Sequence, residues 1–409
     1  MEECIDANSI NPEKDQVHDI IQSIFEDIAE EVRVLNHLYA FTPNLVGSGK
    51  EKTRPYLPNE FDYHLICTEI RRFVDIIYTQ TNISENMVLV KQELAHKLPS
   101  HLYDHYGHFI MDELRSELDV LIHKVLPGIM TSEKYKNKLN LETSFLDDKE
   151  ISCLRVTWRG RSYKDMPIYI DLVVALEINS YKCLSDVFRE PHASYVDQSR
   201  YFVFNKGLAA IGYFIAFSDT EQRLMRSLPA SARLGFMFAK AIRLGDLFDQ
   251  EIYTKMHHVR NLEDFLRTYI LKTCLFYCAI FLKRTHLDLY ESLVPIEWTY
   301  LIFKQVEQGL VQGCIISIFS WNIYKEGHAV LFHCPESVDT PDDEKKACCF
   351  DRADLLVITR QLIGVVKLVC EEREINLDRA DQIIQECASK AYLRYSLDPN
   401  FQQGKHYPG

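Results

Sequence analysis

Two carboxylates stand one residue apart in the run EFDYHL (60–65). The run predicts a β-strand, in which residues i and i+2 point to the same face, so Glu60 and Asp62 would project side by side. Adjacent carboxylates repel each other, and burying them is costly unless a cation neutralises them. Hard divalent cations such as Mg²⁺ prefer carboxylate oxygens and often keep nucleotide phosphates as further ligands. The pair therefore indicates a divalent-cation site suited to phosphate chemistry.

A third acid lies in a second strand-like run, IYIDLVVALEI (168–178), which is rich in β-branched residues. Asp171 interrupts the apolar pattern of this run, where a charge needs a reason. On a neighbouring strand it would complete a two-metal site with the first two acids. Spacing alone leaves another interpretation open, in which Glu60 and Asp62 lie on a solvated strand edge and Asp171 pairs with an Arg or Lys.

The stretch GSGK (47–50), just before the acids, resembles a phosphate-binding loop at first sight. A P-loop requires G-x-x-x-x-G-K-[ST]. Here Asn44 occupies the place of the first glycine, and Glu51 replaces the magnesium-binding hydroxyl residue. Pro55 and Pro58 also disfavour a helix that starts there. The sequence therefore excludes a P-loop, and we expect the lysine of this stretch to lie in a mobile loop.

The rest of the sequence predicts the elements that position these acids. Residues 12–41 predict one long helix, because apolar residues recur with helical periodicity and the other face is acidic. Three strand-like runs follow, at 60–65, 151–158 and 168–178. The expected later helices are 231–244, 262–284, 295–320 and 352–395. This order predicts an α+β chain with a core of residues 1–220 and a helical lobe of residues 221–409.

The composition of the 409-residue chain is that of an acidic globular protein. Its formal net charge is -13 and its pI about 5.6, so it is a poor default binder of DNA or anionic membranes. The N-terminus is too polar for a signal peptide, and the longest apolar run, 274–282, is far shorter than the ~20 residues that span a bilayer. The 12 cysteines are scattered, as expected for free thiols. We expect a cytoplasmic protein without a membrane segment.

The acids occur within a pattern that resembles a known superfamily. Gly47-Ser48, followed after a loop by PNEFD (58–62), resembles the G-S…E-x-D signature of nucleotidyltransferases. The PNEFD ending is similar to that of cyclic GMP–AMP synthase and its animal relatives, the cGAS-like receptors. YIDLVVALE (169–177) is similar to the strand that carries their third acid. Two later segments are similar, more loosely, to the helices of the family's nucleotide pocket: 232–243 and 265–276.

This resemblance implies a two-lobed nucleotidyltransferase fold with an N-terminal spine helix, a mixed β-sheet lobe and a C-terminal helical lobe. It implies an enzyme that joins two nucleoside triphosphates, such as ATP and GTP, into a cyclic dinucleotide second messenger and releases pyrophosphate. Such enzymes are receptors of innate immunity and antiviral defence. By this resemblance Glu60, Asp62 and Asp171 are the catalytic acids and hold two Mg²⁺ or Mn²⁺ ions.

The resemblance also implies a set of nucleotide-binding residues. Gly47 would let the backbone approach the phosphates, and Ser48 would donate its hydroxyl and backbone N–H. Tyr269 matches a tyrosine that stacks on a base, although a core aromatic residue would look the same. For Lys206 and Lys240 the alternative is a solvated surface lysine. The full set is Gly47, Ser48, Lys206, Ser218, Glu221, Lys240, Thr268, Tyr269 and Lys272.

The chain departs from the vertebrate synthase in ways that change the expected activator. The interval 220–239 contains no His and no Cys, so the family's zinc thumb is absent. Because that thumb helps the synthase grip DNA, and because the N-terminal helix is acidic, we favour double-stranded RNA over DNA as the activating partner. Ligand binding could also drive oligomerisation. The family's guanine-reading arginine would fall near Phe214, which leaves the two bases open.

Two further groups of residues have more than one interpretation. A basic series at near-heptad spacing could form a phosphate-binding face or a solvated helix face; it consists of Arg226, Arg233, Lys240 and Arg243. A second group could bind Zn²⁺, but its contiguous pairs differ from the usual C-x₂₋₄-C spacing, which favours plain thiols. Its members are His333, Cys334, Cys348 and Cys349.

The sequence supports one leading hypothesis and two alternatives. The leading hypothesis is an active cyclic dinucleotide synthase, because the set of Glu60, Asp62 and Asp171 is intact. The first alternative is a catalytically silent nucleotide-binding scaffold of the same fold, like the male-abnormal developmental proteins. The second is a non-cyclising transferase that adds nucleotides to an RNA end.

Overall fold

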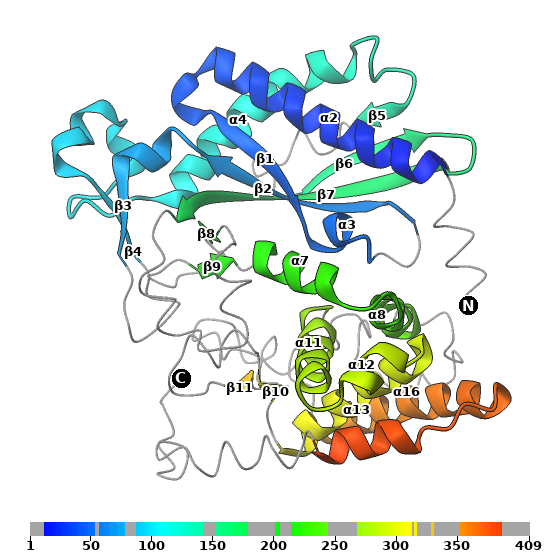
Figure 1. Cartoon of the computed structure of the whole chain (residues 1–409). Helices are drawn as coiled ribbons and strands as arrows, with labels where there is room; N and C mark the ends of the chain where they lie inside the picture. The colour runs from blue at the N-terminus through cyan, green and yellow to red at the C-terminus, as the bar shows by residue number, and fades with distance from the viewer. Residues whose placement is uncertain are drawn as a thin grey trace. The chain divides into compact units, whose positions relative to one another are not determined.

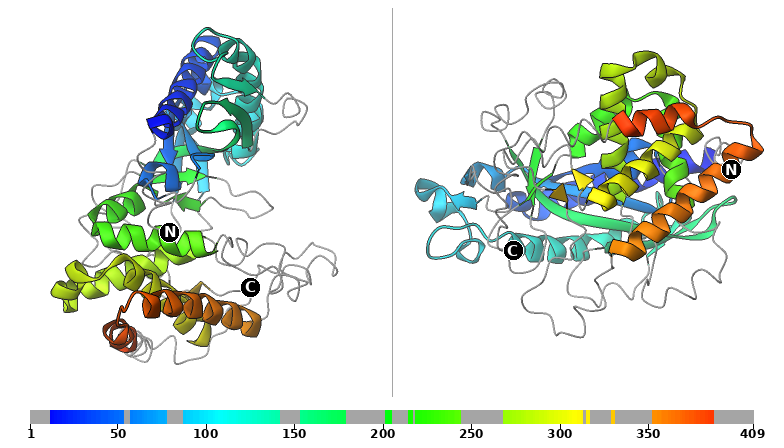
Figure 2. Two further views of the ribbon diagram at one scale, coloured as in Figure 1. Left: turned by 90° about the vertical axis from the view of Figure 1, so that its right-hand side faces the viewer. Right: turned by 90° about the horizontal axis from the view of Figure 1, so that it is seen from below.

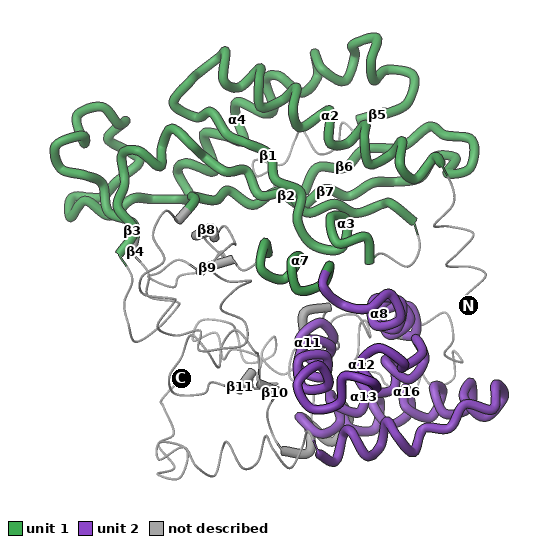
Figure 3. Tube along the Cα trace, viewed as in Figure 1, with its two compact units in different colours: residues 1–226 green, residues 227–409 purple. Residues whose placement is uncertain are grey.

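The structure is a computed structural model. The chain forms two compact units, residues 1–226 and 227–409 (Figure 3). The division predicted after residue 220 falls inside a helix, α7 (Ser218–Ser227). The residues described are 12–53, 57–77, 87–141, 153–178, 201–204, 214–216, 218–243, 268–312, 315–316, 329–330 and 352–386. Mixed α-helix and β-sheet in one chain confirms the prediction of the α+β class.

Unit 1 is built on a mixed sheet of seven described strands (Figure 1). Its main path runs in the order β1 (Phe41–Val46), β2 (Glu60–Cys67), β7 (Lys164–Ile178), β6 (Cys153–Arg159) and β5 (Leu139–Leu141). Two more strands continue from β7, namely β8 (Tyr201–Phe204) and β9 (Phe214–Ala216). The pairing of β2 with β7 is parallel, and the other described pairings of this sheet are antiparallel.

Two long helices, α2 (Pro12–Leu35) and α4 (Met111–Met130), cover one face of this sheet (Figures 1 and 2). The apolar stripe of α2 faces the sheet, where the Phe25 and Tyr63 rings stack with centroids 4.4 Å apart. The helix predicted over 12–41 ends earlier, at Leu35. The next residue, Asn36, has an extended backbone. Its side chain accepts a hydrogen bond from the Leu38 N–H and so caps a short 3₁₀ turn.

The N-terminal end of α2 is fastened to the sheet by one carboxylate. Glu13 is buried and accepts hydrogen bonds from Trp158 Nε1 and Ser162 N, both at 2.7 Å, and from Tyr163 N at 3.3 Å. Burial alone would raise the pKa of Glu13, but these hydrogen bonds outweigh it and lower the pKa to about 2. A Cβ on Gly160 would overlap this carboxylate and the Trp158 indole, so the turn has room only for glycine.

The smaller elements of unit 1 lie outside the seven-stranded sheet. A separate hairpin pairs β3 (Val74–Ile77) with β4 (Met87–Val90). A short helix, α3 (Gly47–Glu51), lies between β1 and β2 in the chain. The 3₁₀ turns are η1 (His37–Tyr39), η2 (Ile70–Phe73), η4 (Gln92–Lys97) and η5 (Ser100–Leu102).

Among the described residues of unit 2, the named elements are helices apart from two paired strands, β10 (Ile315–Ile316) and β11 (Ala329–Val330). Its central helix is α13 (Pro295–Gln312), which packs against three others and buries Trp298, Tyr300 and Phe303. Those three are α8 (Ala230–Arg243), α11 (Thr268–Thr285) and α16 (Arg352–Glu372). A short helix, α12 (Leu287–Ser292), lies between α11 and α13 in the chain.

Two of the predicted helices in unit 2 are too long. The helix predicted to continue to residue 320 ends at Gln312, and β10 follows. The helix predicted over 352–395 breaks after Glu372, because Glu374 adopts a left-handed φ of 54°. The Asn376 side chain then accepts the Asp378 N–H at 2.7 Å, which caps a new helical segment at 378–386. Within the described residues, the helices are too short or too polar to cross a membrane.

Candidate metal centre on the exposed sheet face

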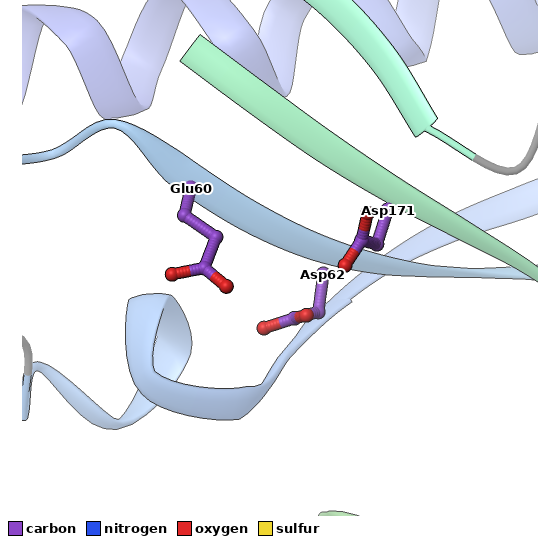
Figure 4. Close-up of side chains that lie close together, drawn as sticks. All are labelled: Glu60, Asp62 and Asp171. Atoms are coloured by element: carbon purple, nitrogen blue, oxygen red, sulfur yellow. The ribbon is translucent and has the colours of Figure 1, made fainter. Parts of the chain in front are cut away.

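The three acids singled out in the sequence lie together on unit 1 (Figure 4). The parallel register places Asp62 of β2 directly opposite Asp171 of β7, and Glu60 opposite Tyr169. Each of the three acids offers one carboxylate oxygen, and these oxygens all lie within 4.8 Å of one another. Glu60 and Asp171 are exposed, and Asp62 is half-buried. The group could hold a metal ion.

The alternation of β2 explains why the acids gather on this face. Phe61 and Tyr63 are 1% exposed, since their side chains point toward α2. Glu60 and Asp62 therefore point to the opposite face of the same strand. A register slip of one residue would bury both acids and expose both aromatic rings, so the apolar half of the strand fixes the position of the polar half.

The separation of the oxygens fits a hard divalent cation. Mg²⁺ binds oxygen at ~2.1 Å, so two ligands on opposite sides of one ion are ~4.2 Å apart. Oxygens within 4.8 Å of one another reach this geometry through small rotations of Glu60, Asp62 and Asp171. Carboxylates are also the ligand type that such ions prefer. The chemistry of the ligands and the distances between them are therefore compatible with a divalent ion.

Gly47 is shaped by its contact with this group. Its φ is +63°, and an added Cβ would overlap Asp62 Oδ2. It follows Val46, the β1 residue that pairs with Asp62, and it begins α3 together with Ser48. Only glycine combines this backbone conformation with this close approach. Gly47 thus lets the chain turn directly over the Asp62 carboxylate.

Lys50 differs from the sequence-based expectation of a mobile loop residue. It lies within α3, is half-buried, and donates from Nζ to Asn44 Oδ1 at 3.0 Å. The short helix is closed by Lys52, which has a left-handed φ of 56°. The prediction was wrong because proline at 55 was taken to exclude a helix before it, whereas the single turn ends at Glu51.

Two neighbours of the acids were missed in the sequence analysis. His64 continues the row of Glu60 and Asp62 on β2; burial, with a smaller effect of the Lys50 charge, lowers its pKa to about 4. Cys153 of β6 lies opposite Asp171 in the antiparallel register. Burial and the adjacent Asp171 raise the pKa of the Cys153 thiol to about 11, so it stays protonated at neutral pH. The alternation of side chains along β2 could have predicted that His64 lies on the same face as Glu60 and Asp62. No feature of the local sequence predicts the position of Cys153.

The predicted nucleotide-binding residues are distributed over both units. Ser218 and Glu221 lie in the first turns of α7 in unit 1. Lys240 of α8 and Lys272 of α11 belong to unit 2 and are only 5% and 7% exposed. The interpretation of Lys240 as a solvated surface lysine is therefore wrong. Thr268 and Tyr269 begin α11, while Lys206 lies outside the described residues.

The basic series does not form one solvated helix face. Arg226 is exposed near the end of α7, Arg233 donates to the Leu228 carbonyl at 3.0 Å, and Lys240 is buried. The proposed zinc ligands all lie outside the described residues, namely His333, Cys334, Cys348 and Cys349. The main chain of Phe214 is part of β9.

Comparison with known proteins adds no relative. No model of a protein family matches the sequence, and a search of curated proteins finds no match either. The site residues and the motif that contains them are therefore the features that bear on function.

Proposed function

We propose that this chain is a metal-dependent nucleotidyltransferase that condenses two nucleoside triphosphates into a cyclic dinucleotide. The observation that carries the proposal is the meeting of Glu60, Asp62 and Asp171 within 4.8 Å on one sheet face. The placement of Gly47 against Asp62 supports it, because this glycine opens the G-S…E-x-D motif. The PNEFD sequence at 58–62 further favours the cGAS-like branch of the superfamily.

The chemistry needs little from the protein beyond positioning and charge. Bound Mg²⁺ or Mn²⁺ would supply neutralisation of phosphate charge and acidification of a ribose hydroxyl. The hydroxyl oxygen forms a bond to the α-phosphorus, the bond from that phosphorus to the bridging oxygen breaks, and pyrophosphate leaves while the hydroxyl proton passes to solvent. A second such step closes the ring. Glu60, Asp62 and Asp171 would hold the cations, and the Gly47-Ser48 backbone, which begins beside Asp62, would receive the triphosphate.

The proposed activator is double-stranded RNA, and the proposed setting is innate immune defence in the cytoplasm. The interval 220–239 without His or Cys gives no basis for the DNA-gripping zinc thumb of the vertebrate synthase. The net charge of -13 also requires any RNA contact to be a local basic surface rather than the whole molecule.

The test is a product assay. The protein is incubated with Mg²⁺ or Mn²⁺, the four labelled nucleoside triphosphates, and duplex RNA, duplex DNA or neither. We expect a phosphatase-resistant product whose formation requires the metal. Asp62→Asn should abolish it, whereas the matched variant Asp75→Asn, at an exposed aspartate in β3, should not.

The other outcomes separate the alternatives. Tight nucleotide binding by folded protein without product under every condition would identify a silent scaffold. Extension of a labelled RNA primer without a cyclic product would identify a non-cyclising transferase. Product formation that survives Asp62→Asn would refute the role given to the three acids.

A further inference from the structure

A second row of side chains lies next to the three acids on the same sheet face. The strand registers place Arg155 of β6 opposite Tyr169 of β7, and Tyr169 opposite Glu60 of β2. Paired residues on neighbouring strands point to the same face, so these three side chains form a row across the sheet. The next row contains Cys153, Asp171 and Asp62 in the same strand order.

Tyr169 is an aromatic residue on the exposed side of β7. Its neighbours Ile168 and Ile170 are 0% and 1% exposed, whereas Tyr169 keeps 36% of its surface exposed. The Arg155 guanidinium lies over the ring, 4.9 Å from its centroid. Such a cation–π contact holds a side chain in place. The pair therefore presents a fixed aromatic surface with a positive charge beside it.

The spacing connects this pair to the metal centre. Neighbouring strands are about 4.8 Å apart, and residues i and i+2 of one strand are about 6.6 Å apart. Tyr169 is thus separated from Glu60 by the spacing between two neighbouring strands, and from Asp171 by the spacing between residues i and i+2 of one strand. A nucleotide whose phosphates lie at the acids extends its sugar and base over a distance of this order. Aromatic side chains beside nucleotide sites stack on bases with little base preference.

We propose that Tyr169 is the stacking surface for the base of a nucleoside triphosphate bound at Glu60, Asp62 and Asp171, and that Arg155 is the positioning residue that holds its ring. This inference rests on the proposed function and deepens it by assigning a base subsite on unit 1. Because stacking tolerates any base, the subsite accepts purines and pyrimidines and favours the larger purine ring.

The test is calorimetric titration of ATP and GTP into the full chain with Mg²⁺. Tyr169→Leu keeps apolar volume but removes the aromatic face, and we expect affinity to fall roughly 5- to 150-fold. Tyr169→Phe and Tyr169→Trp should bind within about threefold of the unmodified protein, since a ring is retained. Arg155→Ala should give an intermediate loss. The matched control is Tyr106→Ala, which changes a tyrosine that is 74% exposed elsewhere in unit 1.

The outcomes distinguish this inference from the proposed function. If Asp171→Asn abolishes metal-dependent binding but Tyr169→Leu binds like the unmodified protein, the stacking subsite is refuted and the metal centre stands. If nucleotides do not bind, or bind independently of Asp171, both proposals fail. Loss of duplex RNA binding in Tyr169→Leu with unchanged nucleotide affinity would also overturn the inference. Thermal unfolding of each variant shows whether a loss arises from the site or from the fold.

Discussion

Unit 1 uses carboxylates in two contrasting ways. At the start of α2 a single carboxylate, Glu13, is surrounded by donors from Trp158, Ser162 and Tyr163. On the other face of the sheet, Glu60, Asp62 and Asp171 bring three carboxylates within 4.8 Å of one another. At Glu13 the protein provides the hydrogen bonds that stabilise one negative charge. At the three acids it concentrates negative charge, as a cation site requires.

The difference indicates how stability and function are divided in this unit. Glu13 joins a helix to a turn of the sheet, so its loss should reduce the free energy of unfolding. The three acids repel one another, so the loss of one should cost activity but little stability. Three substitutions and one change of pH test whether stability depends on Glu13 and function on the three acids, beginning with the largest expected effect.

Under the proposed function, Asp171→Asn is expected to reduce nucleotidyl transfer by roughly 10³-fold or more, because one of the three charges proposed to hold the cations is removed without a change in size. The melting temperature without divalent cations should stay the same or rise slightly. Rate measurement by product assay and calorimetric melting of the same preparation check both parts. A large fall in melting temperature would show that Asp171 contributes to stability, which contradicts the purely functional role given to the three acids.

Glu13→Ala is expected to lower the free energy of unfolding by about 2–4 kcal/mol, because the Trp158 indole and the Ser162 amide lose their buried acceptor. Urea titration followed by fluorescence measures this loss. Activity per folded molecule should change little. Glu31→Ala, at an exposed position on the same helix, is the control and should change stability by less than about 0.5 kcal/mol.

Gly47→Ala should affect both properties, because Gly47 lies at the acids and has a φ of +63°. The backbone strain should cost about 1–3 kcal/mol, and displacement of Asp62 should lower activity about 10- to 100-fold. Gly128→Ala is the control, since an added Cβ there meets nothing within 4 Å. Unchanged activity in Gly47→Ala would show that the close approach to Asp62 is unimportant.

Acid should weaken unit 1 through Glu13 within a defined pH range. Its pKa is about 2 in the folded chain and 4.5 without these contacts, so its contribution is fully present above pH 4.5 and is lost as pH falls toward 2. The difference in urea midpoint between the unmodified protein and Glu13→Gln should therefore shrink over this range. A difference that stays constant down to pH 2.5 would show that the Glu13 charge does not contribute.

Much of the candidate metal centre could be predicted from the sequence, because it depends on short-range rules. The spacing of Glu60 and Asp62 on a strand fixes their shared face, and an acid in an apolar run marks Asp171. The pairing of Asp62 with Asp171 required the family resemblance, since no local rule gives the register of strands so far apart in the chain. Cys153 was missed for the same reason, because its position depends on the register of a third strand.

Other features depend on contacts that leave little trace in the sequence. Glu13 resembles any acid in the first turn of a helix, and only its contact with Trp158 distinguishes it. Lys240 and Lys272 were expected among solvated or phosphate-binding lysines, and their burial depends on the packing of α8, α11 and α13. The break after Glu372 was missed because its left-handed residue is Glu374 rather than a glycine or asparagine.

The parallel pairing of β2 with β7 has a consequence for how the protein is made. The segment between these strands contains β3 to β6 and α4, so two of the three acids are synthesised long before the third. On the ribosome the Glu60–Asp62 pair emerges without Asp171, and such non-local pairing is among the slower events of folding. The three acids therefore come together only after β7 has paired with β2, so a chain that ends before β7 has no complete acidic group.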